Sequence, residues 1–341
     1  MNRKNLGLLV VAILGMAMIA FISQPGREEA SSDAKLGKPL FEGLKASLST
    51  VERVKVASSK YTTTISQLDG VWVIEEKDNY PADFGKFSEF LGKLADAVYV
   101  ERKTARPENF GPLGVASLDD PNSTATQVSI ETSDEQRDVL LGTASAGRGG
   151  TFARKPDEEQ AWLVTSLGEI QSDPAKWIAP VILSVESEQV RKIVDTDRDG
   201  KQLVVSRKAE GDPLTVENLP AGAELKYGTV ADGLARALVN LRATDVRGRT
   251  LEPMKNAITS VYELFDGSKV TLTAVADHDE HWLRVDVTPG EEGETRATSI
   301  DTAKTDRFEF QIEGYAYEQL HKTMADMIKP AEAPKADKKS G

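Results

Sequence analysis

The feature that most constrains the fold is an order of segments that occurs twice along the chain. The first copy opens with strand-like runs at Val51 to Val56, Thr62 to Leu68 and Val71 to Ile74. Asp69-Gly70 between the last two runs predicts a tight hairpin turn. A helix then follows Pro81-Ala82-Asp83, because apolar side chains recur at helical spacing from Phe84 to Leu94.

The second copy repeats this order. Val190 to Val194 predicts a strand, and Asp199-Gly200 predicts the turn after it. Gln202 to Arg207 and Leu214 to Val216 predict the returning strands. Thr229 to Asp245 predicts the second helix, with leucines along one face.

Further segments complete both copies. The remaining predicted strands are Gln127 to Thr132, Asp138 to Leu141 and Ala161 to Val164 in the first copy, and Ser260 to Phe265, Lys269 to Ala274, His281 to Val287 and Arg307 to Ile312 in the second. Each copy closes with a helix-like segment, Ser172 to Leu183 or Tyr315 to Ile328.

The fold class that this order predicts is α+β. Strands arrive as hairpins and meanders and are not separated by regular crossover helices, so we expect antiparallel sheets with helices packed on one face. We predict an internal duplication with repeats at residues 39–184 and 185–328. A chance likeness of two unrelated α+β halves is the alternative. A doubly wound dinucleotide-binding fold does not fit this pattern.

An apolar stretch from Leu6 to Ile22 predicts where the chain resides. It has 17 residues and no charged side chain. As a helix it would span roughly 25 Å, enough for a thin hydrocarbon core. Arg3 and Lys4 precede it, and the positive-inside rule keeps them in the cytoplasm. We therefore predict a single-pass anchor of the inner (cytoplasmic) membrane over residues 1–22, with the rest of the chain extracytoplasmic, in the periplasm.

A cleaved signal peptide is the alternative interpretation of the same stretch. Such peptides have a shorter apolar region, about 7–15 residues, and end in a small-x-small cleavage site. Phe21 falls at the −3 position of the best cut, which fits poorly. Residues 23–38 behind the stretch are polar and predict a flexible tether, and residues 329–341 predict a disordered tail.

Composition excludes some classes of partner. The chain has a net charge of −12, and its first 22 residues contribute two positive charges, so the exported part is more acidic still. This balance argues against nucleic acid as a partner, which requires a basic face. The chain has no cysteine, so disulfides and thiol chemistry play no part, and stability must come from packing.

The sharpest local motif is the run Asp195-Thr196-Asp197-Arg198-Asp199-Gly200. Carboxylates at alternate positions before a glycine open an EF-hand calcium loop. The rest of the loop does not fit, because Ser206 stands where a bidentate Glu is needed. We favour a solvated hairpin turn and leave calcium binding by Asp195, Asp197 and Asp199 as an open alternative.

No other motif predicts a catalytic, cofactor or metal site. His278 and His281 have the HxxH spacing but fall in a predicted turn, and His321 is the only other histidine. The glycine-rich run Gly142 to Gly150 lacks the Gly-Lys-Ser/Thr ending of a phosphate loop and predicts a hairpin tip. The four tryptophans predict core packing. We therefore expect no cofactor and no enzymatic activity.

The ordered set of segments resembles a bacterial family, the domain-of-unknown-function family numbered 4340. The segments that carry the resemblance, after the N-terminal apolar stretch, are PLFEGL (39–44), VERVKV (51–56), DGVWVI (69–74), NYPADFGKFSEFLGKLA (79–95), ENFGPLGV (108–115), VLLG (139–142), QAWLV (160–164) and DPAKWIAPVIL (173–183). The resemblance implies a single-pass accessory protein. Relatives are often encoded beside ABC-type transport systems related to those associated with gliding motility.

Three classes of function remain open on these grounds. The first is an extracytoplasmic interaction module, an accessory subunit of an ABC-type transport complex whose partners are permease or ATPase subunits. The second is a solute-binding module with a ligand cleft between the two repeats. The third, less favoured, is an envelope hydrolase.

Overall fold

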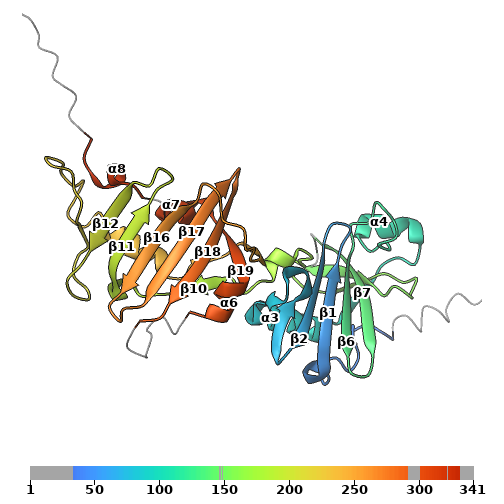
Figure 1. The fold of residues 1–341 in the computed structure, drawn as a ribbon. Helices are drawn as coiled ribbons and strands as arrows, with labels where there is room; N and C mark the ends of the chain where they lie inside the picture. Colours follow the sequence, from blue (N-terminus) through green and yellow to red (C-terminus); the bar gives the residue numbers. More distant parts are fainter. Residues whose placement is uncertain (1–33, 146, 148, 291–299, 321, 331–341) are drawn as a thin grey trace, which may run out of the picture. The chain divides into compact units, whose positions relative to one another are not determined.

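We analysed the fold in a computed structural model, which describes residues 34–145, 147, 149–290, 300–320 and 322–330. The described chain forms two compact units (Figure 1). The first consists of the residues up to Thr64 together with Gly85–Ser172, and the second of Ile65–Phe84 together with the residues from Asp173 onward. These units describe packing, and their boundaries differ from those of the predicted repeats because Ile65–Phe84 packs with the second unit.

The first unit contains one antiparallel sheet. In the order β1-β6-β7-β8-β9-β5, its strands are β1 (Val51–Ala57), β6 (Thr126–Thr132), β7 (Gln136–Ala144), β8 (Gly150–Arg154), β9 (Trp162–Thr165) and β5 (Tyr99–Arg102). Strand β2 (Thr62–Leu68) begins in this unit. The short helices η1 (Leu48–Thr50), η3 (Pro107–Asn109) and α4 (Phe110–Leu113) lie in the connections.

The predicted first helix is confirmed as α3 (Phe84–Asp96). Phe87, Phe90, Leu91 and Leu94 are buried along one face of it, as their helical spacing requires. Phe84, at the start of the helix, is 61% exposed and does not join the core.

The second unit contains a longer antiparallel sheet. In the order β13-β12-β11-β16-β17-β18-β19-β15, its strands are β13 (Thr215–Val216), β12 (Gln202–Ser206), β11 (Val190–Thr196), β16 (Ile258–Leu264), β17 (Lys269–Asp277), β18 (Glu280–Thr288), β19 (Phe308–Ile312) and β15 (Asp245–Gly248). A meander of the later part of β2 with β3 (Val71–Ile74) and β4 (Tyr80–Pro81), and a pair of β10 (Val181–Leu183) with β14 (Leu241–Arg242), complete its strands.

Helices of the second unit are short. They are η2 (Glu75–Lys77), η4 (Pro174–Lys176), η5 (Ser187–Gln189), α5 (Asp232–Ala235), η6 (Arg236–Leu238), α6 (Thr302–Arg307), α7 (Gly314–Leu320) and α8 (Met324–Met327). The fold class is therefore α+β, rich in antiparallel sheet and with few helices, as the hairpin pattern predicts.

The two sheets share an order of strands and a bulge. The order β1-β6-β7-β8-β9-β5 in the first unit corresponds, strand for strand along the chain, to β11-β16-β17-β18-β19-β15 in the second. The register of β1 against β6 shifts between Val51 and Arg53, and that of β11 against β16 shifts between Val190 and Lys192. The bulge thus falls at the same place in both strand pairs.

Two predicted helices are largely wrong. In Thr229 to Asp245 only α5 and η6 are helical, because Asn240 adopts a positive φ of 53° and the chain then continues into β14. In Ser172 to Leu183 the helical part is η4, where the Asp173 side chain caps Ala175 N, and β10 follows. In both segments, pairing of β10 with β14 outweighs the helical spacing of the apolar residues.

The predicted membrane anchor, Leu6 to Ile22, lies outside the described residues. In the part of the chain that the structure describes, helices are too short or too polar to cross a membrane. Most of the predicted tether and tail also lie outside it. The last tether residues are bonded to the first unit, where Gly37 N donates to Tyr99 O at 2.8 Å.

Candidate functional site

The run from Asp195 to Gly200 forms the turn between β11 and β12. Asp197 Oδ1 accepts hydrogen bonds from Asp199 N at 2.9 Å and from Lys201 N at 2.8 Å, so the turn closes on itself. Asp195 lies within β11 and is buried, whereas Asp199 is exposed. Over the described ranges, the structure holds no group of three or more His, Asp or Glu side chains placed to bind a metal ion.

The histidines do not converge either. His278 lies at the tip of the β17–β18 hairpin, with its Nδ1 at 2.8 Å from Asp277 Oδ1. The ring of His281 lies 4.7 Å from that of Tyr317, centroid to centroid. His321 lies outside the described residues.

The glycine-rich run joins β7 to β8, which pair as a hairpin. A Cβ atom at Gly142 would lie 2.0 Å from Leu113 O, so close backbone packing requires this glycine. Of the four tryptophans, Trp162, Trp177 and Trp282 are buried and Trp72 is half-buried, in line with a packing role.

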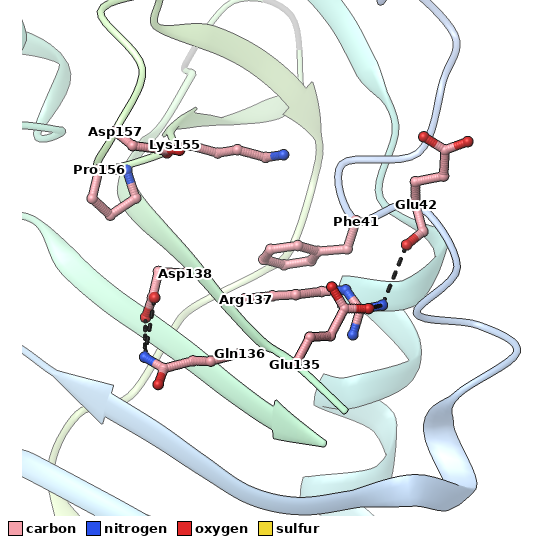
Figure 2. A pocket seen from close by; sticks show the side chains of 9 residues that line it. All are labelled: Phe41, Glu42, Glu135, Gln136, Arg137, Asp138, Lys155, Pro156 and Asp157. Carbon is pink, nitrogen blue, oxygen red and sulfur yellow. Dashed lines mark hydrogen bonds and ion pairs between the residues drawn. The ribbon is translucent and has the colours of Figure 1, made fainter. Parts of the chain in front are cut away.

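A hollow of about 520 Å³ opens in the first unit beside Arg137, and we call it the arginine hollow (Figure 2). It is lined by Phe41, Glu42, Glu135, Gln136, Arg137, Asp138, Lys155, Pro156 and Asp157. Arg137 projects from β7, and its Nη2 contacts Glu135 Oε1 and donates to Glu42 O at 3.5 Å. Its Nη1 is buried and has no hydrogen-bond partner among the residues that the structure describes.

The chemistry of the arginine hollow suits a carboxylate. Figure 2 shows Lys155 across the hollow, with its ammonium group pointing toward the side of Phe41 and Arg137. A buried guanidinium donor without an acceptor costs about 1–3 kcal/mol, which an incoming acceptor relieves. Arginine binds carboxylates more strongly than neutral acceptors, because both groups are charged and planar. The lining also holds Glu42, Glu135, Asp138 and Asp157, and Arg137 and Lys155 already lie near Glu135 and Glu158, so an incoming carboxylate would compete with these groups for the two cations.

A second hollow, of about 290 Å³, lies in the second unit, and we call it the aspartate cavity. It is lined by Asp195, Asp197, Lys201, Gln202, Leu203, Lys322, Thr323, Met324 and Ala325. Asp195 is 5% exposed, and within the described part of the chain neither of its carboxylate oxygens has a hydrogen-bond partner. Ser260 lies opposite it on β16 but donates its hydroxyl proton to Leu320 O at 2.9 Å.

Burial therefore dominates the titration of Asp195. It raises the pKa of the Asp195 carboxyl to about 7, against a smaller lowering effect of neighbouring Ser260. Tyr262, two residues further along β16, is fully buried, and its hydroxyl also lacks a partner. Burial first, and the charge of Asp195 second, raise the pKa of Tyr262 well above its usual range.

Glu309 on β19 is also a buried carboxylate, but unlike Asp195 it accepts hydrogen bonds from neighbouring side chains. Arg247 Nε donates to it at 2.8 Å and Arg284 Nε at 2.7 Å. Burial acts to raise the pKa of Glu309, but the hydrogen bonds from Arg247 and Arg284 outweigh it and the pKa is lowered. This carboxylate is fully paired, so we assign it a structural role.

Sequence analysis does not identify Arg137 and misjudges Asp195. Nothing in the run around Arg137 distinguishes it from a solvated arginine. For Asp195 a signal exists, because alternation from Ile193 places it on the buried face of β11. The calcium-like spacing also singles out Asp195, but on the basis of the EF-hand pattern and not of burial.

Comparison with known proteins gives one match. The model of a family described as Domain of unknown function (DUF4340) matches residues 72–264, which is more than half of the chain. No curated protein and no solved structure matches the chain.

Proposed function

We propose that this chain, which belongs to the DUF4340 family of domains of unknown function, is a membrane-anchored extracytoplasmic interaction module without enzymatic activity. Its role would be that of an accessory subunit of an ABC-type transport complex, held at the inner membrane by residues 6–22. Permease or ATPase subunits would be its partners.

The body of this module is proposed to consist of two copies of one α+β repeat with helices on one face of each sheet. Shared strand order and the shared bulge in β1 and β11 support this proposal. Two isolated bridges add to it: Ala82 pairs with Ile178 before α3, and Leu225 pairs with Ile328 before α5. Such agreement in register is difficult to reach by chance.

The arginine hollow is the observation that supports docking. Its lining combines two cations, Arg137 and Lys155, with four acidic residues, and the buried Nη1 of Arg137 has no acceptor among the described residues. A carboxylate from a partner, on an Asp or Glu side chain or a C-terminus, would supply the acceptor that Arg137 Nη1 lacks. Charge complementarity of this kind provides specificity more than affinity.

Affinity purification of the full-length chain from detergent-solubilised membranes, followed by mass spectrometry, tests this function. We expect permease or ATPase subunits with the wild type and with the control Arg106→Gln, an exposed arginine of the same unit. Arg137→Gln should lose them, because it removes the guanidinium from the hollow. Lys155→Glu, which leaves Arg137 in place, should also lose them.

Two results would contradict the proposal. One is recovery of the wild type without any transport subunit. The other is equal recovery of partners by Arg137→Gln, Lys155→Glu and the wild type. Far-ultraviolet circular dichroism of each variant confirms that loss of a partner does not reflect loss of the fold.

A further inference from the structure

The aspartate cavity lies at a place where the two units differ. In the first unit β1 and β6 place Val56 opposite Val128, and both are fully buried. In the second unit the bulge sets the same register, and Asp195 stands opposite Ser260. A buried carboxylate thus replaces a valine at the equivalent place, although neither of its oxygens has a hydrogen-bond partner among the described residues.

The segments that lie beside these two strand pairs also differ between the units. In the first unit the segment after β9 is tied to the β1–β2 hairpin: Thr63 Oγ1 donates to Ser172 O at 2.8 Å, and Ser172 Oγ donates to Ser58 Oγ at 2.8 Å. In the second unit the corresponding segment, Lys322–Ala325, leaves the aspartate cavity between itself and the β11–β12 turn. In the second unit Arg198 Nη2 of the turn donates to Tyr317 Oη at 3.1 Å, and the cavity lies beside this contact, lined by the turn and by Lys322–Ala325.

We propose that the aspartate cavity binds a small zwitterionic solute of the amino-acid class, with its ammonium group on Asp195 and its carboxylate on Lys322 and Lys201. Because both Asp195 oxygens are buried, the proposal requires the side chain to turn toward the cavity to meet the ammonium group. This site is independent of the docking proposed for the arginine hollow, and it gives the solute-binding class a defined location within the second unit.

The charges of the cavity select this class of solute. An ammonium group provides the donors that both Asp195 oxygens lack, in a site where low dielectric strengthens the pair. Lys201, which is exposed, and Lys322 would repel a dication and attract an anionic group. A volume of 290 Å³ lies at the lower end of ligand pockets, roughly 300–1,000 Å³, and so favours a small molecule.

A metal ion fits the cavity less well. Among the described residues that line it, Asp195 and Asp197 supply the carboxylates, and Asp197 Oδ1 already accepts hydrogen bonds from two backbone amides of the turn. Calcium requires six to eight oxygen ligands in most proteins. A solute that brings its own cation needs only one carboxylate.

Isothermal titration calorimetry of the full-length chain in detergent tests the proposal. The probes are the twenty standard amino acids, one at a time. Ethylamine, which carries only the ammonium group, and propionate, which carries only the carboxylate, are the single-charge arms of the experiment. We expect at least one amino acid to bind, and both single-charge arms to bind at least about tenfold more weakly. Asp195→Asn should raise the Kd at least about tenfold, and Lys322→Gln about three- to tenfold.

The control variants are Asp277→Asn and Lys208→Gln, which lie in the same unit and outside the cavity lining. They should bind as the wild type does. Failure of every amino acid to bind would overturn the proposal, and so would an unchanged Kd in Asp195→Asn. Binding of ethylamine as tight as that of the best amino acid would overturn the assignment of the lysines.

Discussion

The central strand pairs of the two units have the same register and different interiors. Val56 and Val128 in the first unit give an apolar contact that requires no partner. Asp195 and Ser260 in the second give a buried carboxyl whose oxygens have no hydrogen-bond partner among the described residues. The second unit therefore places a group that lowers its stability beside a cavity, at a position where the first unit has an apolar contact.

A second difference of the same kind separates β9 from β19. Leu163 in the first unit and Glu309 in the second are both fully buried. Leu163 pairs with the edge strand β5, and Glu309 pairs with the edge strand β15. Glu309 has two arginine partners, and Asp195 has none. The second unit thus holds one buried carboxylate as part of its structure and leaves another free to meet a ligand.

The largest effect is expected when the paired carboxylate is removed. Glu309→Gln leaves Arg247 and Arg284 without their counter-charge and should lower the free energy of unfolding by about 3–5 kcal/mol. Urea unfolding followed by circular dichroism measures it. Glu263→Gln, which removes more exposed ion pairs, is the control and should cost about 1 kcal/mol or less. A loss below about 1 kcal/mol for Glu309→Gln would mean that the cluster is not structural.

Asp195→Val places an apolar side chain in the second unit where the first unit has Val56. The folded-state pKa of Asp195, about 7, exceeds its usual 3.8, so between these values the folded chain holds a proton that the unfolded chain has lost. Stability of the wild type therefore falls as pH rises through this window and levels off above it, by up to about 4 kcal/mol in all.

Thermal unfolding at several pH values measures this difference. Asp195→Val should be more stable than the wild type at pH 8, and the gap should be small at pH 4. Asp195→Asn is the matched control, because it removes the ionisation and keeps the polar shape. Parallel pH profiles of the wild type and Asp195→Val would contradict a buried, unpaired carboxyl.

Thr63→Val opens the junction that closes the first unit. It removes the hydrogen bond from Thr63 Oγ1 to Ser172 O and should cost about 1 kcal/mol, since the shape is kept. The neighbouring Thr62→Val is the control. Hydrogen exchange of the β1–β2 hairpin should quicken in Thr63→Val alone, and unchanged exchange would mean that this bond does not close the junction.

Asp199→Asn should have the smallest effect. Asp199 and Lys201 form an exposed pair at 3.6 Å, and such pairs contribute about 0–1 kcal/mol. Calcium chloride should leave the melting temperature of both the wild type and Asp199→Asn unchanged. A calcium-dependent rise in the wild type that Asp199→Asn abolishes would restore the EF-hand-like interpretation of this turn.

Strand pattern and tight turns could be predicted from local chemistry. Alternation at Val54 and Val56 and the turn at Asp69-Gly70, where both residues have positive φ, correctly placed β1, β2 and β3. Phe87 and Leu94 at helical spacing correctly placed α3. These signals lie within a few residues of one another, so a single segment carries them.

The rest depends on contacts between distant segments. Leu238 and Leu241 have helical spacing, yet Leu241 pairs with Leu183 in β10, almost sixty residues earlier. The Glu309 cluster requires arginines from β15 and β18, which no local pattern brings together. Ser260, which stands opposite Asp195, donates its hydroxyl proton to Leu320 O, sixty residues further along the chain. None of these pairings has a sequence signature of its own.

The pKa of Asp195 in the intact chain tests the central claim most directly. Selective ¹³C labelling of aspartate carboxyls, with Asp195→Asn to assign the resonance, allows its titration to be followed by nuclear magnetic resonance. An unpaired carboxyl beneath the aspartate cavity should titrate at about 7. A midpoint at or below about 4, the usual range of exposed aspartates, would show that the group is solvated or paired and would contradict the account.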